Sequence, residues 1–275
     1  MKRIAIITGA SSGFGREFVK ILKEKSEIEE IWAIARHQDK LDKLKKQMGR
    51  KIRPISMDVA DLTRIEELGT MLAENEIEVR CLINNAGYAK FCSYGDLNVT
   101  ESIDMINVNI SGVVAMGLVC IPYMPRGSHI INIASQAAFQ PLPYQNLYSS
   151  TKAFVRNYTR ALNVELKDRG ITATAVCPGW LKTHLYDRAN IGAAKATRRF
   201  CGMTTPDKVA RKAVADADCG RDISIYSFYV NFCHIGAKLL PQRVMMKLWL
   251  CQQRINPCAR PKSVNNNSYS RPSQQ

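Results

Sequence analysis

Short apolar runs alternate with longer amphipathic stretches along almost the whole chain. Continuous apolar runs are typical of buried strands, whereas apolar positions that repeat every three to four residues are typical of helices. The runs predict strands at residues 4–7, 31–35, 52–57, 79–84, 129–134, 172–177 and 223–227. The amphipathic stretches predict helices at residues 16–25, 39–48, 61–74, 101–124, 146–169 and 206–217. This alternation predicts an α/β fold in which helices cover both faces of a parallel sheet.

The first predicted strand runs directly into a glycine-rich turn and then into a helix. Gly9, Gly13 and Gly15 follow the strand, and the amphipathic stretch 16–25 comes next. Glycine lets the backbone turn sharply and approach a pyrophosphate, which binds the N–H groups that open the helix. A tight structural turn is the alternative. The order of the three parts favours a dinucleotide-binding fold of the doubly wound Rossmann type, with about seven strands.

Tyr148 and Lys152 stand four residues apart in a predicted helix, and Ser135 ends the strand before it. Residues four apart share one helix face, so the ammonium group lies close to the phenol. A nearby positive charge and a hydroxyl donor both stabilise a phenolate. We therefore expect Lys152 and Ser135 to lower the pKa of Tyr148 by roughly 2–3 units from ~10, which makes the phenol a usable acid or base near neutrality. A surface Tyr/Lys pair is the alternative.

Six spaced motifs together resemble the short-chain dehydrogenase/reductase family. They are Thr-Gly-x-x-x-Gly-x-Gly at 8–15, Asn84-Asn85-Ala86-Gly87, Asn109, Ser135, Tyr148-x-x-x-Lys152 and Pro178-Gly179. The resemblance covers about residues 1–222. It implies a Rossmann enzyme that moves a hydride between a nicotinamide and a carbonyl/alcohol pair. A dinucleotide turn and an acid/base phenol are the two parts that this chemistry requires.

The resemblance implies a role for each of four catalytic residues. Tyr148 donates a proton to the carbonyl oxygen in reduction, while Lys152 lowers the pKa of the tyrosine and holds the nicotinamide ribose. Ser135 steadies the substrate oxygen. Asn109 resembles the residue that keeps a water for proton relay, and a helix-kinking polar residue of the core is its alternative.

The expected cofactor contacts come mostly from the residues that follow strand ends. They are Gly9, Ser11, Ser12, Gly13, Phe14, Gly15, Arg36, Asp58, Val59, Asn85, Ala86, Gly87, Tyr148, Lys152, Pro178, Gly179, Leu181 and Thr183. By resemblance, Asp58 accepts from the adenine amino group, with a cap on helix 61–74 as its alternative. Asn85 to Gly87 line the nicotinamide ribose, and the backbone from Pro178 to Leu181 holds the carboxamide together with Thr183.

Arg36 bears on which dinucleotide is used. An arginine about 20 residues past the glycine turn suits a 2′-phosphate, through charge-assisted forked hydrogen bonds. Many NADP-using relatives carry a basic residue just before the second glycine, where this chain has Ser12. Asp39 is expected to cap the next helix rather than to bind a ribose. The pattern therefore favours NADP(H) over NAD(H), without excluding the latter.

The substrate pocket is expected between residues 136–147 and a lid over 184–205. Its predicted binding residues are Ser135, Phe139, Tyr144, Tyr148, Trp180 and Leu185. These segments are aromatic and carry few charges, which favours a large apolar ketone or alcohol: a steroid or bile acid, a 3-oxoacyl chain or a sphingoid base. Ordinary core packing of the aromatic side chains is the alternative.

Residues 1–258 contain no internal linker, which predicts a single domain, and residues 259–275 have the composition of a disordered tail. No hydrophobic signal segment follows Met1, and the nine cysteines show no metal-ligand spacing. We therefore expect a cytoplasmic protein with reduced thiols and no metal site.

The chain has a net charge of +15, and residues 223–275 contain no Asp or Glu. No motif typical of nucleic-acid binding supports that class of partner. The apolar and basic segment 229–254 is compatible with three roles: peripheral membrane contact, a wall of the substrate cleft, or packing on the sheet or another subunit, which base rates favour. Its longest charge-free run, 223–237, is too short for a membrane span, which takes about 20 residues.

Two further interpretations concern assembly and function. Homodimers or homotetramers through helices 101–124 and 146–169 are usual in the family that the chain resembles. A catalytically silent dinucleotide sensor or scaffold is the alternative to an enzyme, although Ser135, Tyr148 and Lys152 are all present. A sugar-nucleotide epimerase is disfavoured, because its turn has a different glycine spacing and little sequence follows Thr183 here.

Overall fold

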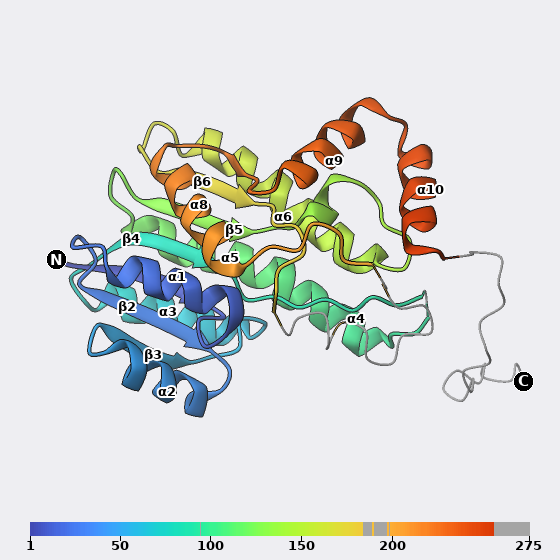
Figure 1. Cartoon of the computed structure of the whole chain (residues 1–275). Helices are drawn as coiled ribbons and strands as arrows, with labels where there is room; N and C mark the ends of the chain where they lie inside the picture. Colours follow the sequence, from blue (N-terminus) through green and yellow to red (C-terminus); the bar gives the residue numbers. More distant parts are fainter. Residues whose placement is uncertain (94, 184–188, 190–196, 198, 256–275) are drawn as a thin grey trace, which may run out of the picture.

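The computed structural model describes residues 1–93, 95–183, 189, 197 and 199–255 (Figure 1). Its seven strands are β1 (Lys2–Thr8), β2 (Glu30–Ala35), β3 (Ile52–Ser56), β4 (Ile77–Asn84), β5 (His129–Ile133), β6 (Thr172–Val176) and β7 (Ile223–Ser224). They form one parallel sheet in the order β3-β2-β1-β4-β5-β6-β7. The chain winds outward from β1 in both directions, so the predicted doubly wound Rossmann-type α/β fold is confirmed.

The helices lie in two layers that sandwich the sheet. They are α1 (Gly13–Lys23), α2 (Gln38–Met48), α3 (Leu62–Ala73), α4 (Val99–Ile106), α5 (Gly112–Cys120), α6 (Asn146–Glu165), α8 (Pro206–Asp218), α9 (Phe228–Leu239) and α10 (Gln242–Gln253). Helices α1, α2 and α8 pack on one face, and α3, α5 and α6 on the other. Alternate residues of β1 pack in two different cores. Ile4 and Ile6 belong to the core with α3, α5 and α6, whereas Ala5 and Ile7 belong to the core with α1, α2 and α8. Burial on both faces explains why this strand is continuously apolar.

The predicted helix 101–124 is interrupted in the structure. A π-helical turn, Asn107–Ser111, separates α4 from α5, and a 3₁₀ turn, Ile121–Tyr123, follows. Turns of this kind inside an α-helix often accompany a functional site. Within the described part of the chain, Val99–Tyr123 is the one helical run long and apolar enough to cross a membrane. Met116 and Cys120 of this run are fully buried against the sheet, as expected for the core helix of a globular domain.

Several other element boundaries also differ from the prediction, three of them as follows. β7 ends at Ser224 rather than at residue 227, and α6 ends at Glu165 rather than at 169. Asp39 lies in the first turn of α2, whose N-cap is His37, so its assignment as the cap is wrong. Boundaries of this kind depend on local backbone angles that apolar periodicity does not determine.

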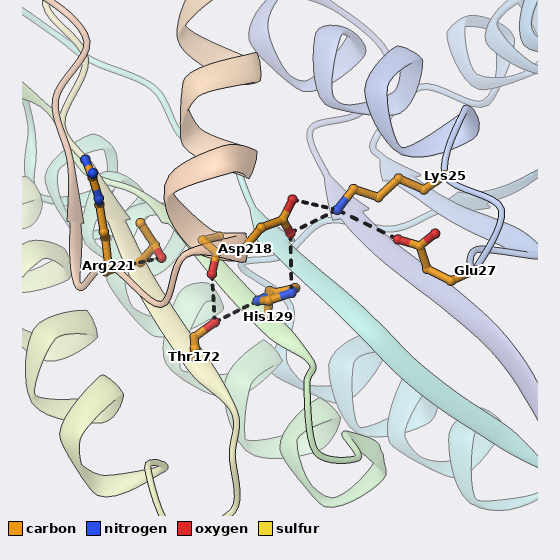
Figure 2. A network of polar contacts seen from close by, with 8 residues as sticks. Lys25, Glu27, His129, Thr172, Asp218 and Arg221 are labelled. Atoms are coloured by element: carbon orange, nitrogen blue, oxygen red, sulfur yellow. Dashed lines mark hydrogen bonds and ion pairs between the residues drawn. The ribbon is translucent and has the colours of Figure 1, made fainter.

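A polar network holds the amino edge of the sheet together (Figure 2). Lys25, which follows α1, pairs with Asp218 of α8 at 2.9 Å. His129 opens β5 and lies between Asp218, at 3.4 Å, and Thr172 of β6, at 2.7 Å. A small cavity of about 290 Å³ lies beside these groups. The network joins four elements at the edge opposite the carboxyl ends of the strands.

Candidate active site

A cavity of about 1480 Å³ opens at the carboxyl ends of the strands. In open parallel sheets, ligands bind at this edge. Every residue predicted to contact a cofactor lines this cavity, with the single exception of Gly15. The structure therefore brings together residues from segments as distant as 9–14 and 178–183. Their contact with a dinucleotide remains a prediction.

The turn after β1 is so close to its neighbours that it requires glycine at two positions. Gly9 has a φ of +65°, and a Cβ there would lie 2.7 Å from Nδ2 of Asn85. A Cβ on Gly15 would lie 2.2 Å from the carbonyl oxygen of Gly9. Gly15 thus lets α1 approach the turn, and its own contact with a cofactor remains a prediction. The cradle that these glycines leave beside the start of α1 fits a pyrophosphate.

Asn85 and Thr8 fix the ends of β1 and β4 to each other. The Asn85 amide donates to the carbonyl oxygens of Thr8 and Gly9, at 3.0 and 3.2 Å. The Thr8 hydroxyl accepts from the backbone N–H groups of Asn85 and Ala86, both at 3.0 Å. The glycine turn is therefore held open by hydrogen bonds from the neighbouring strand.

Basic side chains gather where β2 ends. Arg36, whose side chain is 59% exposed, lies with its Nη1 3.7 Å from Oδ2 of Asp58. Arg16, Lys20, His37 and Lys40 line the same part of the cavity, and the sequence pattern did not single them out. Arg16 and Lys20 are four apart on α1, which was the available signal. The cluster suits a phosphate on the adenosine ribose.

Asp58 does not cap helix α3, which was the alternative to its role at the adenine ring. Its Oδ1 accepts from the backbone N–H of Ala60 at 3.0 Å. The N-cap of α3 is Asp61, which accepts from Arg64 N. Asp58 instead faces the cavity beside Val59.

Ser135, Tyr148 and Lys152 meet at the wall of the cavity, and all three side chains are buried. Ser135 Oγ accepts from the backbone N–H of Ala137 at 3.1 Å, which leaves its hydroxyl hydrogen for the Tyr148 phenol. Lys152 Nζ lies 5.9 Å from the centre of the tyrosine ring and donates to the carbonyl oxygen of Ile133 at 2.8 Å. The helical spacing in α6 and the end of β5 therefore bring these three groups together.

Burial dominates the electrostatics of this cluster. It raises the pKa of Tyr148, and the hydrogen bond from Ser135 opposes that rise. Burial also lowers the pKa of Lys152, to about 8. The expectation that Lys152 lowers the pKa of Tyr148 is therefore wrong for this structure, because the ammonium is turned toward Ile133. Near neutral pH the phenol keeps its proton and is ready to donate it.

Asn109 lies behind the cavity wall, fully buried in the π-helical turn. Its Nδ2 donates to the Tyr88 carbonyl oxygen at 3.0 Å and to Thr151 Oγ1 at 3.1 Å, and its Oδ1 accepts from Tyr88 N at 3.1 Å. A Cβ on Gly87 would lie 3.0 Å from Asn109 Oδ1 and 3.3 Å from Lys152 Nζ. These contacts make Asn109 a positioning residue for the segment beside Lys152, and the water relay remains a prediction.

An apolar wall adjoins Tyr148. The ring centres of Tyr148 and Phe91 are 5.8 Å apart, those of Phe91 and Trp180 6.1 Å, and those of Trp180 and Phe200 4.9 Å. Leu142 and Gln145, from the segment 136–147 in which the pocket was expected, also line the cavity, and so do Lys90 and Phe91, which the sequence pattern did not single out. The signal available for Lys90 and Phe91 was their place just after the Asn-Asn-Ala-Gly turn.

Two predicted substrate residues lie elsewhere. Phe139 stacks on His234 of α9 with ring centres 4.1 Å apart, and neither Phe139 nor Tyr144 lines the cavity. Their contact with a substrate remains a prediction. Leu185 and most of the predicted lid, 184–205, lie outside the described residues, as does the predicted tail, 259–275.

Helix α10 supports this wall from behind. Trp249 belongs to the buried cluster that contains Tyr148, Phe91 and Trp180, and its Nε1 donates to Pro143 O at 3.1 Å. Gln253 accepts from Arg199 N and donates to Arg199 O, at 3.0 and 3.1 Å. Three roles were considered for segment 229–254. The inner face of α10 packs against the domain, behind the aromatic wall of the cavity.

Comparisons with known proteins agree with this geometry. The model of the family described as short chain dehydrogenase matches residues 3–193. A very-long-chain 3-oxoacyl-CoA reductase-B of Danio rerio is 30% identical over 254 residues, which cover 88% of this chain and 78% of that protein. An uncharacterised oxidoreductase of Staphylococcus epidermidis is 29% identical over 196 residues, covering 70% and 84%. The closed form of serine dehydrogenase complexed with NADP+ superposes with a TM-score of 0.69 at 27% identity, covering 81% and 93%.

Proposed function

This chain belongs to the short-chain dehydrogenase family and is an oxidoreductase, and from this premise we propose that it reduces a ketone on an apolar substrate with NADPH. One observation carries the proposal: the buried phenol of Tyr148, hydrogen-bonded to Ser135, faces the cavity beside an aromatic wall. A silent sensor would have no need of this arrangement. The Tyr/Ser/Lys cluster therefore favours the enzyme over the alternative.

The proposed cofactor site extends from the glycine turn to Thr183. Gly9, Gly13 and the start of α1 would hold the pyrophosphate. Arg36, with Arg16 and Lys40 nearby, would hold a 2′-phosphate, which supports NADPH over NADH. The serine dehydrogenase structure, which carries NADP+, is consistent with this preference. When bound, the nicotinamide supplies a hydride to the carbonyl carbon.

Side chains of the Tyr/Ser/Lys cluster stabilise the negative charge that develops on the substrate oxygen. Tyr148 donates its proton to that oxygen, and the single hydroxyl hydrogen of Ser135 can turn from the phenol to the substrate oxygen to steady it. Lys152, whose Nζ lies 5.9 Å from the centre of the tyrosine ring, would hold the nicotinamide ribose, as the family resemblance implies. Donors that are fixed before the reaction stabilise a developing alkoxide without reorganising.

A 3-oxoacyl chain is the substrate class that we propose first. The wall of Phe91, Leu142 and Trp180 suits a long apolar chain, while Lys90 and Lys182 offer positive charge at the cavity lining. The relative from Danio rerio is named as a very-long-chain 3-oxoacyl-CoA reductase. Keto-steroids, bile acids and 3-ketosphingoid bases share the apolar chemistry and form the comparison set.

A substrate panel tests the proposal. The purified enzyme is mixed with NADPH or NADH and each ketone, and nucleotide oxidation is followed by absorbance. We expect turnover with NADPH and 3-oxoacyl thioesters, and less with NADH. Binding of NADPH without turnover of any ketone would favour the sensor, and activity confined to small polar sugars would exclude an apolar substrate.

Self-association is a further part of the proposal. Leu118 of α5 and Phe154 and Val164 of α6 are large apolar side chains that remain exposed. We expect these helices to pair in a homodimer or homotetramer, which would cover them. Sedimentation of the wild type and of Leu118→Arg checks this, since an unpaired charge at the interface would dissociate the assembly.

A further inference from the structure

Helix α9 presents a stripe of large apolar side chains to solvent. Phe228, Phe232, Ile235 and Leu239 are spaced four, three and four residues apart, so they share one helix face. Their exposed fractions are 86%, 68%, 48% and 77%. Isolated exposed apolar residues are ordinary, but a contiguous stripe marks an interaction surface.

The other face of α9 is the one that packs on the domain. Val230 is buried, and a Cβ on Gly179 would lie 2.8 Å from its Cγ2. His234 stacks on Phe139. Figure 1 shows α9 and α10 at the end of the molecule farthest from α2. The face of α9 that carries Val230 and His234 already packs on the domain. The exposed stripe is therefore a different face of the helix and not a poorly packed part of the core.

Helix α10, like α9, has one buried face and one exposed apolar face. Met245, Trp249 and Gln253 point inward and are buried. Val244 and Leu248 are 41% and 52% exposed, and Leu240, which joins the two helices, is 43% exposed. We call the exposed residues 228, 232, 235, 239, 240, 244 and 248 the apolar surface.

Basic side chains border the apolar surface. Lys238, Arg243 and Lys247 are exposed, and each immediately precedes one of its members. No acidic residue occurs in 223–275. A symmetric contact with a second copy would therefore set like charges against each other, with no carboxylate in this segment to pair with them. Anionic lipid headgroups offer both the missing negative charge and an apolar layer.

We propose that α9 and α10 bind the anionic face of a lipid bilayer. The apolar surface enters the boundary between headgroups and acyl chains, and Lys238, Arg243 and Lys247 lie among the phosphates. The helices rest on the bilayer and do not cross it, because each is only 12 residues long. The observations behind this proposal are the exposure of the apolar surface and the charge beside it, and they are independent of the proposed reaction.

Flotation of the full chain with vesicles tests this. One set of vesicles is phosphatidylcholine alone, and the other is an equimolar mixture with phosphatidylglycerol. We expect the protein to float with the anionic vesicles at low salt and much less with the neutral ones. Phe228→Ser/Phe232→Ser lowers the partition coefficient by about tenfold or more, since two exposed phenyl groups no longer enter the bilayer.

Two further variants separate the apolar and electrostatic contributions. Lys238→Gln/Lys247→Gln weakens binding to anionic vesicles and flattens its salt dependence. Leu62→Ser/Ile103→Ser removes exposed apolar side chains from other helices, outside both the cavity and the proposed self-association surface, and is the matched control, with binding unchanged. Circular dichroism and turnover of a water-soluble ketone verify that each variant is folded, and they test the reaction separately from the surface.

Three outcomes would overturn the proposal. The wild type stays out of the floating fraction with anionic vesicles, or Phe228→Ser/Phe232→Ser floats as the wild type does. In the third outcome, sedimentation shows an assembly that this double variant dissociates while vesicles bind neither protein. That result would assign the apolar surface to a second copy of the chain.

Discussion

Trp249 of α10 donates its indole N–H to the carbonyl oxygen of Pro143, 3.1 Å away. The hydrogen bond links the last described helix to the loop that leads into α6 and Tyr148. Because Trp249 also packs in the cluster that contains Tyr148 and Phe91, helix α10 supports the aromatic wall of the cavity from behind.

Replacing Trp249 tests this support. Trp249→Phe keeps an aromatic ring but removes the N–H donor, and we expect the free energy of unfolding to fall by about 1 kcal/mol. Trp249→Ala also leaves a cavity, and we expect a loss of about 3–5 kcal/mol. Both should raise KM for an apolar ketone more than KM for NADPH. Equal effects on the two KM values would contradict a specific role on the substrate side.

Gly15 and Gly236 form a matched pair for the packing of the glycine turn. A Cβ at 15 would lie 2.2 Å from the backbone oxygen of Gly9, whereas a Cβ at 236 would meet nothing within 4 Å. We expect Gly15→Ala to lower the free energy of unfolding by about 3 kcal/mol. Gly236→Ala, in the interior of α9, should raise it by up to about 1 kcal/mol. Urea titrations measure both, and two similar values would refute the close approach.

Arg36 provides a test of nucleotide preference. We expect Arg36→Ala to raise KM for NADPH by about tenfold or more while KM for NADH changes little, because a charge-assisted contact to the 2′-phosphate is lost. Lys43→Ala, which removes an exposed positive charge from the same region outside the cavity, serves as the control. An equal rise for both nucleotides would remove the assignment of Arg36 to the 2′-phosphate.

His129 predicts a pH dependence of stability. Burial lowers its pKa despite the opposing charge of Asp218, so the unfolded chain binds this proton more readily than the folded one. The stability is therefore greatest above the unfolded value of about 6.5 and is lost progressively as the pH falls below it. Thermal unfolding across this range should show a shallower slope for His129→Gln than for the wild type. The exposed His37→Gln is the control, and an unchanged slope in His129→Gln would contradict the prediction.

The sequence predicted the fold and most of the cavity lining because both depend on patterns that can be read along the chain. Apolar runs located the strands, and motifs at strand ends came together because parallel strands end at one edge. The direction of a loop side chain cannot be read in this way, and Phe139 and Tyr144 do not line the cavity although their segment was expected to. The side chain of Asn109, in the π-helical turn, bonds to the backbone of Tyr88, 21 residues away, and such a contact cannot be read from local sequence.

The pKa values of Tyr148 and Lys152 could not be predicted from the sequence. Spacing brings Lys152 close to Tyr148, but it does not reveal that both are buried or that the ammonium donates to Ile133. Desolvation, which depends on the whole fold, raises the pKa of the phenol and lowers that of the amine. Arg16 and Lys40 were missed for a similar reason, since only the folded chain shows that they line the same cavity as Arg36.

The role of Tyr148 as proton donor is tested most directly by Tyr148→Phe, which removes one hydroxyl and keeps the ring. NADPH binding is measured by fluorescence titration, and turnover of a reactive ketone is measured by NADPH oxidation. We expect kcat to fall by about 10²–10⁴-fold or more, with the dissociation constant of NADPH nearly unchanged. Turnover of the variant close to the wild-type rate, with NADPH still bound, would contradict the account.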